Sequence, residues 1–292
     1  MMPVFGMLGL AAIWSVYWFI GLTVAERQTA QWRERLARDS FRLECATESW
    51  GGYPFRFQFT CNSPAFASPQ RVSAASKSMT VLAQAYNPWH VIALLDGPTT
   101  VVAGNARQLE ARHGRIVASV KIRDAGEADI SIDVPELALP GWLSAGRLLI
   151  HGRPEPEGAL GLAWSISGLN YEPEGRPPLR VAQSDFVGTL KTDGDLVVHD
   201  IVLKEGAVIY RGSGSVRLDG SKRLSGLLNT ETNDLDGLLL ILDPHLDMNE
   251  QQRAAFKTVL GLLGQQAKID LIARDGEFYI GPFKVADLVP LY

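Results

Sequence analysis

Cys45 and Cys61 are the only two cysteines in the chain, and their spacing predicts a disulfide. The segment from Phe41 to Cys61 alternates on both sides of the turn-forming cluster Trp50–Pro54. A hairpin folded about Tyr53 would set Cys45 directly opposite Cys61, at a Cβ separation of about 4.5–5.5 Å that a disulfide can bridge. Two buried free thiols are the alternative interpretation.

A disulfide at these positions also carries information about location. Closing a loop of about 15 residues would stabilise the fold by roughly 3 kcal/mol in the chain-entropy model. Disulfides persist in oxidising compartments. The pair therefore predicts that the body of the protein lies outside the cytoplasm, in a bacterial periplasm.

The remaining chemistry-bearing residues form no recognisable catalytic or metal-binding pattern. The five histidines, at positions 90, 113, 151, 199 and 245, lack the i, i+2 or i, i+4 spacing of a local metal site. The carboxylates between Asp185 and Asp200 fall at turn and solvent-facing positions, and Arg211–Ser215 resembles a nucleophile elbow in composition only. We therefore assign no catalytic residue, no metal ligand and no cofactor, and we expect the protein not to be an enzyme.

The elements that would position the cysteines are strands. Residues alternate at Ile116–Ile122 and Ile130–Val134, and Asp-Gly pairs at positions 193–194, 219–220 and 275–276 are typical of hairpin turns. The segment from Leu196 to Leu218 indicates consecutive strands of a meander. The predicted fold class is mainly β, a long twisted antiparallel sheet that is open, curled or sandwich-like.

Two helices interrupt the strands near the C-terminus. Leucines at 235, 238, 239 and 242 fit one helical face, and Asp247 and Glu250 have capping-box spacing before a stripe at Phe256, Val259, Leu260 and Leu263. Pro244 separates the two segments. The pattern predicts a helical hairpin packed across the sheet.

The N-terminal segment is long enough to cross a membrane. No Asp, Glu, Lys or Arg precedes Glu26, and about 20 apolar residues span the roughly 30 Å hydrocarbon core. A cleaved signal peptide is the alternative, but such signals usually have a basic start and a shorter apolar run. We expect a transmembrane anchor at 1–25, a helical stalk at 26–39 and a β-rich body at 40–292, with a weak subdivision near 153–178.

Orientation receives two opposing signals. Arginines at 27, 33, 35 and 38 follow the span, and the positive-inside rule would place them in the cytoplasm. The cysteines favour an exported body, and we give them more weight. The expected location is the bacterial inner membrane, single-pass, with a cytoplasmic N-terminus and a periplasmic body.

The overall charge limits the choice of partners. The formal net charge is −4, whereas a nucleic-acid-binding domain usually leaves a basic footprint. We therefore expect no nucleic-acid partner. The expected partners are the inner-membrane bilayer and either phospholipid or other envelope proteins.

Four sequence elements together resemble a family of alphaproteobacterial envelope proteins of unknown function. They are Tyr17–Phe19 in the span, Gly52–Phe57 in the first hairpin, Asn87–Trp89, and Asp275–Pro282. The resemblance implies a single-span, membrane-anchored protein, and it implies no catalytic residue because none is assigned in that family. The motif residues selected from these elements are Tyr53, Pro54, Phe55, Arg56, Asn87, Pro88, Trp89, Gly281 and Pro282.

The late meander and strand-rich end are more loosely similar to the AsmA-like group of envelope proteins. That resemblance implies an apolar β groove of the kind found in lipid-transfer proteins. Strands that are apolar on both faces, at Leu196–Leu203 and Ala207–Tyr210, favour the same interpretation. The leading hypothesis is a periplasmic, membrane-anchored protein that binds or transfers lipid. The alternatives are a non-catalytic scaffold or protein-interaction module and, least favoured, an envelope hydrolase.

Overall fold

The computed structural model describes residues 2–70, 72–103, 108–123, 126–245, 250–261, 264 and 266–290. The chain divides into two compact units, Met1–Pro140 and Gly141–Tyr292. The predicted fold class is confirmed, since both units consist mainly of antiparallel strands. The division falls before the predicted stretch at 153–178, which instead forms the end of one strand, the next strand and their connections.

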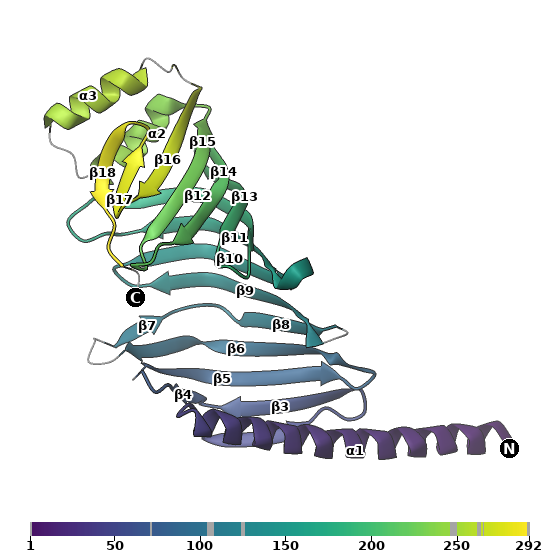
Figure 1. Cartoon of the computed structure of the whole chain (residues 1–292). Helices are drawn as coiled ribbons and strands as arrows, with labels where there is room; N and C mark the ends of the chain where they lie inside the picture. Colours follow the sequence, from purple (N-terminus) through teal and green to yellow (C-terminus); the bar gives the residue numbers. More distant parts are fainter. Residues whose placement is uncertain are drawn as a thin grey trace. The chain divides into compact units, whose positions relative to one another are not determined.

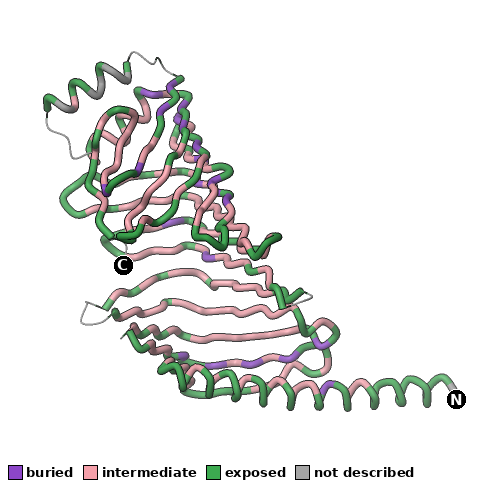
Figure 2. Tube along the Cα trace, in the orientation of Figure 1, coloured by how far each residue is buried: buried purple, intermediate pink, exposed green. Residues whose placement is uncertain are grey.

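The N-terminal helix α1 runs without a break from Met2 to Arg38. It is long and apolar enough to cross a membrane, and the predicted stalk continues the same helix. Its 37 residues give a length of about 55 Å. The N-terminal half of α1 extends beyond the strands of the first unit, and most of its side chains are exposed (Figures 1 and 2).

The first unit contains an antiparallel sheet. Its long strands pair in the order β3, β5, β6, β8 and β9, with β2 beside β3, β4 beside β5, β1 beside β4 and β7 beside β6. The strands are β1 (Arg42–Glu44), β2 (Thr47–Gly51), β3 (Arg56–Asn62), β4 (Ala65–Ala67), β5 (Val72–Gln84), β6 (Asn87–Ala103), β7 (Leu109–Ala111), β8 (Ile116–Ile122) and β9 (Ala128–Leu139).

The second unit is a meander in which each strand pairs with the next. Its strands are β10 (Leu143–Pro154), β11 (Leu160–Tyr171), β12 (Leu179–Leu190), β13 (Leu196–Glu205), β14 (Val208–Leu218), β15 (Leu224–Thr232), β16 (Ala267–Arg274), β17 (Glu277–Ile280) and β18 (Phe283–Asp287). All three predicted Asp-Gly turns join neighbouring strands. A short 3-10 turn, η2 (Pro156–Gly158), connects β10 to β11.

Two helices lie between β15 and β16, as predicted. Helix α2 (Leu235–Leu242) begins at Asp234, whose carboxylate accepts a hydrogen bond from the Gly237 amide, and it is followed by η3 (Asp243–His245) and α3 (Glu250–Gly261). Leu235 is buried against Ala267 and Ile269 in a hydrophobic core cluster of this unit. The predicted cap at Asp247 and the side chains at 256, 259, 260 and 263 lie outside the described residues.

Candidate functional site

One face of the first-unit sheet is apolar across all five long strands. Side chains alternate between the two faces of a strand, so residues opposite one another in register share a face. Two neighbouring rows on this face are apolar from β3 to β9. They are Phe57, Ala83, Val91, Val120 and Ile130, and Phe59, Val81, Ala93, Ala118 and Ile132.

The opposite face of the same strands is more polar. One of its rows contains Thr60, Thr80, Leu94, Val117 and Asp133. The apolar face is covered mainly at its β3 edge. Phe57 and Phe59 are buried there, whereas Ile130 on β9 is 43% exposed and the strands between are mostly half-buried (Figure 2).

Helix α1 and this apolar face enclose a cavity of about 760 Å³, which we call the juxtamembrane groove. Among the described residues that line it, Arg33 alone is charged. The helix contributes Tyr17, Gly21, Val24, Ala25, Gln28, Thr29, Trp32 and Arg33 to the lining. The strands and their connections contribute Leu43, Trp50, Phe57, Phe59, Met79, Val81, Leu82, Ala83, Pro88, Trp89 and Val91.

Trp18 fixes α1 against β3 at one end of the groove. Its side chain is only 3% exposed, and its indole Nε1 donates a hydrogen bond of 3.0 Å to the carbonyl oxygen of Arg56. Its ring stacks on Phe57, with centroids 5.9 Å apart, and meets Tyr53 edge to face. Gly21 permits this close approach, because a Cβ there would lie 2.5 Å from the Phe57 ring.

Two further aromatic residues of α1 donate hydrogen bonds to backbone carbonyls of the sheet connections. The indole of Trp14 donates to Pro54 at 2.9 Å, and the hydroxyl of Tyr17 donates to Ala85 at 2.6 Å. The acceptors lie in the β2–β3 and β5–β6 connections. The helix is therefore held by specific polar contacts as well as by packing.

Arg33 lies at the other end of the groove. It forms an ion pair of 2.8 Å with Glu48, and its guanidinium lies 5.3 Å from the centre of the Phe59 ring. Its Nε is buried and has no hydrogen-bond partner among the described residues. This end of the groove therefore contains a buried donor for which the described residues supply no acceptor.

Cys45 and Cys61 form a disulfide, with their Cα atoms 5.3 Å apart. The predicted register of the hairpin was wrong, because Glu48 rather than Cys45 lies directly opposite Cys61. The connection is centred between Pro54 and Phe55 rather than on Tyr53, and Gly52 has a left-handed backbone (φ +102°). Cys45 lies between β1 and β2, outside the residues that pair between β2 and β3, and it bonds to Cys61 from that position.

The structure brings together the motif residues of the first unit but not those near the C-terminus. Tyr53, Pro54 and Arg56 contact α1, Phe55 is exposed beside them, and Pro88 and Trp89 of β6 line the groove. Asn87 pairs with Gln84 at the start of β6. Gly281 and Pro282 belong to the second unit, where they form the β17–β18 turn and the Gly281 amide donates to the carbonyl of Asp270.

Sequence reasoning singled out Pro88 and Trp89 but not the other residues of β5 and β6 that form the sheet wall of the groove. Val81 and Ala83 have no distinctive sequence signal, because their role follows from register with β3 and β6. The sequence directed attention to Leu196–Tyr210 instead. The juxtamembrane groove lies in the first unit.

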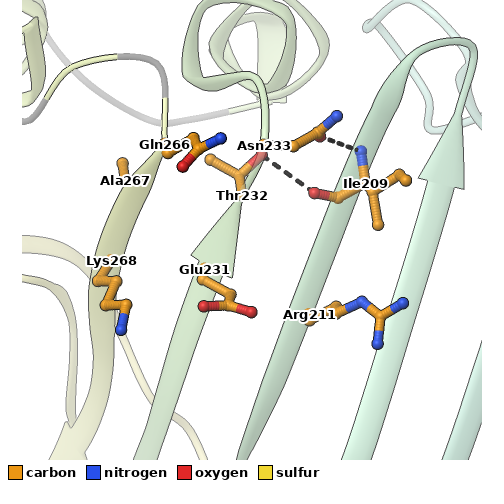
Figure 3. Close-up of a pocket in the computed structure, with 8 residues that line it drawn as sticks. All are labelled: Ile209, Arg211, Glu231, Thr232, Asn233, Gln266, Ala267 and Lys268. Carbon is orange, nitrogen blue, oxygen red and sulfur yellow. Dashed lines mark hydrogen bonds between the residues drawn. The ribbon is translucent and has the colours of Figure 1, made fainter.

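The second unit carries a polar depression of about 310 Å³ across β14, β15 and β16 (Figure 3). Arg211, Glu231 and Lys268 lie side by side on neighbouring strands, with Arg211 opposite Glu231 and Glu231 opposite Lys268. Alternating charges opposite one another stabilise a solvent-facing sheet. Among the described residues of the whole chain, no three His, Cys, Asp or Glu side chains form a group that could hold a metal ion.

A family model described as uncharacterized protein conserved in bacteria (DUF2125) matches residues 18–288. The chain belongs to this family. The matched region includes Trp18, both connections that contact α1, and the sheet wall of the groove. No curated protein and no solved structure matches the chain.

Proposed function

We propose that this member of the family is anchored in the bacterial inner membrane by α1 and holds a phospholipid acyl chain in the juxtamembrane groove. The observation that carries the proposal is the composition of the groove. Its two walls are an apolar sheet face and a helix long and apolar enough to cross a membrane. Arg33 is the single charged residue in the part of the lining that the structure describes. A ligand that fills such a space must itself be apolar over most of its length.

The size of the apolar face suits an acyl chain. The five long strands from β3 to β9 are separated by four interstrand steps, and at about 4.8 Å per step the face extends for roughly 19 Å. One leaflet contributes about half of the roughly 30 Å hydrocarbon core. A complete acyl chain laid across the strands therefore fits the apolar face. It would begin in the groove, which is lined by β3, β5 and β6, and continue over β8 and β9. Large apolar surfaces that remain uncovered usually mark binding sites.

The proposed location rests on the disulfide and the helix together. A disulfide between Cys45 and Cys61 is stable in an oxidising compartment, so we place the body in the periplasm and the N-terminus in the cytoplasm. The resemblance of the strand-rich end to AsmA-like envelope proteins supports the same environment. The described residues that line the groove include no nucleophile with an adjacent base, and we propose binding or transfer of lipid without a catalytic step.

Filling the groove tests the proposal. Val81 and Thr80 are neighbours on β5 with side chains on opposite faces, and only Val81 lines the groove. We expect native mass spectrometry of the detergent-extracted full chain to show bound phospholipid. The Val81→Trp variant should lose most of it, and Thr80→Trp, the matched control, should retain it.

Two results would contradict the proposal. One is wild-type protein that emerges free of lipid under conditions that preserve its β structure, which is the result expected for a scaffold. The other is equal lipid content in the two tryptophan variants, which would place the lipid elsewhere on the protein.

A further inference from the structure

Two segments at one end of the first unit expose large aromatic side chains. They are Gly52–Phe55, between β2 and β3, and Ala85–Trp89, which joins β5 to β6 and includes the first residues of β6; we call them the two connections. Phe55 is 68% exposed, Tyr86 is 67% exposed and Trp89 is 64% exposed. No charged residue occurs in Gly52–Phe55 or in Ala85–Trp89. Exposed aromatic residues in uncharged turns are costly in water, whereas tyrosine and tryptophan favour the membrane–water interface.

These connections are attached to the uncharged part of α1. The Tyr17 hydroxyl donates to Ala85, and Tyr17 precedes the first charged residue, Glu26, by about 14 Å along the helix. Between those two positions Phe19 and Ile20 are each about 60% exposed. If α1 spans the membrane, these side chains require a lipid environment. The edge of the hydrocarbon core then lies C-terminal to Tyr17 along the helix, so the attached connections are at a depth within the membrane.

The hydrogen bonding of the connections suits such a position. Irregular backbone within a membrane must have its polar groups satisfied by protein, because no water is available there. The carbonyls of Pro54, Arg56 and Ala85 accept hydrogen bonds from indole and phenol groups of α1. The same bonds satisfy the donors of the helix, which would otherwise be unpaired in hydrocarbon.

We propose that the two connections, Gly52–Phe55 and Ala85–Trp89, are inserted into the leaflet from which α1 emerges. This inference rests on the proposed function in one respect, that α1 spans the membrane. Pro88 and Trp89 also line the juxtamembrane groove, so the groove opens into that leaflet. An acyl chain then enters laterally from the bilayer without crossing water. Arg56, which is exposed beside the first connection, extends its side chain toward the lipid phosphates.

Single-cysteine labelling of the full chain tests this insertion. The native cysteines are joined in a disulfide, so a cysteine introduced by Phe55→Cys or Tyr86→Cys can be labelled with an environment-sensitive fluorophore without reductant. The matched control is Gln70→Cys in the β4–β5 connection. It lies at the opposite end of the 13-residue strand β5, about 40 Å away. A second control, Ile20→Cys, reports the helix itself.

In vesicles of phosphatidylethanolamine and phosphatidylglycerol, we expect spin-labelled acyl chains to quench labels at positions 55, 86 and 20 severalfold more than the label at 70. Aqueous iodide should give the reverse order. If spin-labelled lipid quenches the label at position 20 but quenches the labels at 55 and 86 no more than the label at 70, insertion of the connections is refuted. The membrane anchor of the proposed function is then retained. If the label at position 20 is also quenched no more than the label at 70, α1 does not span the membrane and the proposed function fails as well. Lipid retention by the Thr80→Trp and Val81→Trp variants reports on the groove separately.

Discussion

Replacing Trp18 with alanine should separate α1 from the sheet and destabilise the first unit. Trp18 is 3% exposed, packs on Phe57 and Tyr53, and donates its indole hydrogen to the Arg56 carbonyl. Removing a buried aromatic side chain of this size costs about 3–5 kcal/mol. At about 2–4 °C per kcal/mol for a unit of this size, the thermal midpoint should fall by roughly 6–20 °C.

A conservative variant separates the hydrogen bond from the packing. Trp18→Phe retains an aromatic ring but leaves the Arg56 carbonyl without its donor, which costs about 1–3 kcal/mol. The midpoint should therefore fall by an intermediate amount, roughly 2–12 °C.

The assay is thermal loss of the β-strand circular dichroism signal of the full chain in one detergent. The matched control is Ile20→Ala on the same helix, because Ile20 is 60% exposed and its replacement should change stability by no more than about 0.5 kcal/mol. Equal midpoints for the Trp18→Ala and Ile20→Ala variants would refute the docking of α1 through Trp18.

Two other predictions concern the same unit. Replacing both Cys45 and Cys61 with serine should lower the free energy of unfolding by about 3 kcal/mol, since the disulfide closes a separation of 16 residues. Reductant should destabilise the wild type similarly and leave the double variant unchanged; an unchanged wild type would contradict this prediction. Hydrogen bonds from Arg115 and Ser78 hold the pKa of Asp96 below its usual range. Because the pKa of Asp96 is lower in the folded state, its ionised carboxylate stabilises the fold above the unfolded-state pKa of about 3.9. This stabilisation is lost as the pH falls below that value. The thermal midpoint of the wild type should therefore drop more than that of Asp96→Asn between pH 7 and pH 3, and parallel pH profiles would refute the assignment.

The cysteine pair shows how far local patterning determines the fold. Both cysteines were predicted to face the same way in one hairpin, and they form a disulfide in the structure. The register could not be predicted, because the first strand divides into β1 and β2, and β1 pairs with β4 instead of continuing the hairpin. That division depends on contacts with residues distant in the sequence.

The aromatic residues of the N-terminal segment show where local patterning fails. Trp14, Tyr17 and Trp18 fit an interfacial belt by composition, and hydropathy correctly marked a helix long enough to cross a membrane. Their hydrogen bonds to Pro54, Ala85 and Arg56 carbonyls leave no sequence signal, because any residue supplies a carbonyl oxygen. Tyr17–Phe19, Gly52–Phe57 and Asn87–Trp89 were therefore recognised as separate sequence elements, and only the structure shows that they meet at the juxtamembrane groove.

The sequence drew attention to apolar strands in a part of the chain other than the juxtamembrane groove, for a related reason. The strands from Leu196 to Tyr210 are apolar, but whether an apolar strand face is covered depends on which elements pack against it. In the second unit, Leu235 of α2 packs on Ala267 and Ile269. In the first unit, α1 covers the β3 edge of a face whose apolar character appears only when Val81 is set opposite Phe59 and Ala93.

The central claim, that lipid occupies the juxtamembrane groove, is tested most directly by photo-crosslinking in living cells. A photoreactive amino acid is placed at Val81 in one strain and at Thr80 in another, so that the two probes differ only in the face of β5 that they occupy. The account predicts a phospholipid adduct on the protein with the probe at position 81 and none with the probe at position 80. Equal labelling at both positions, or protein adducts without lipid at position 81, would contradict it.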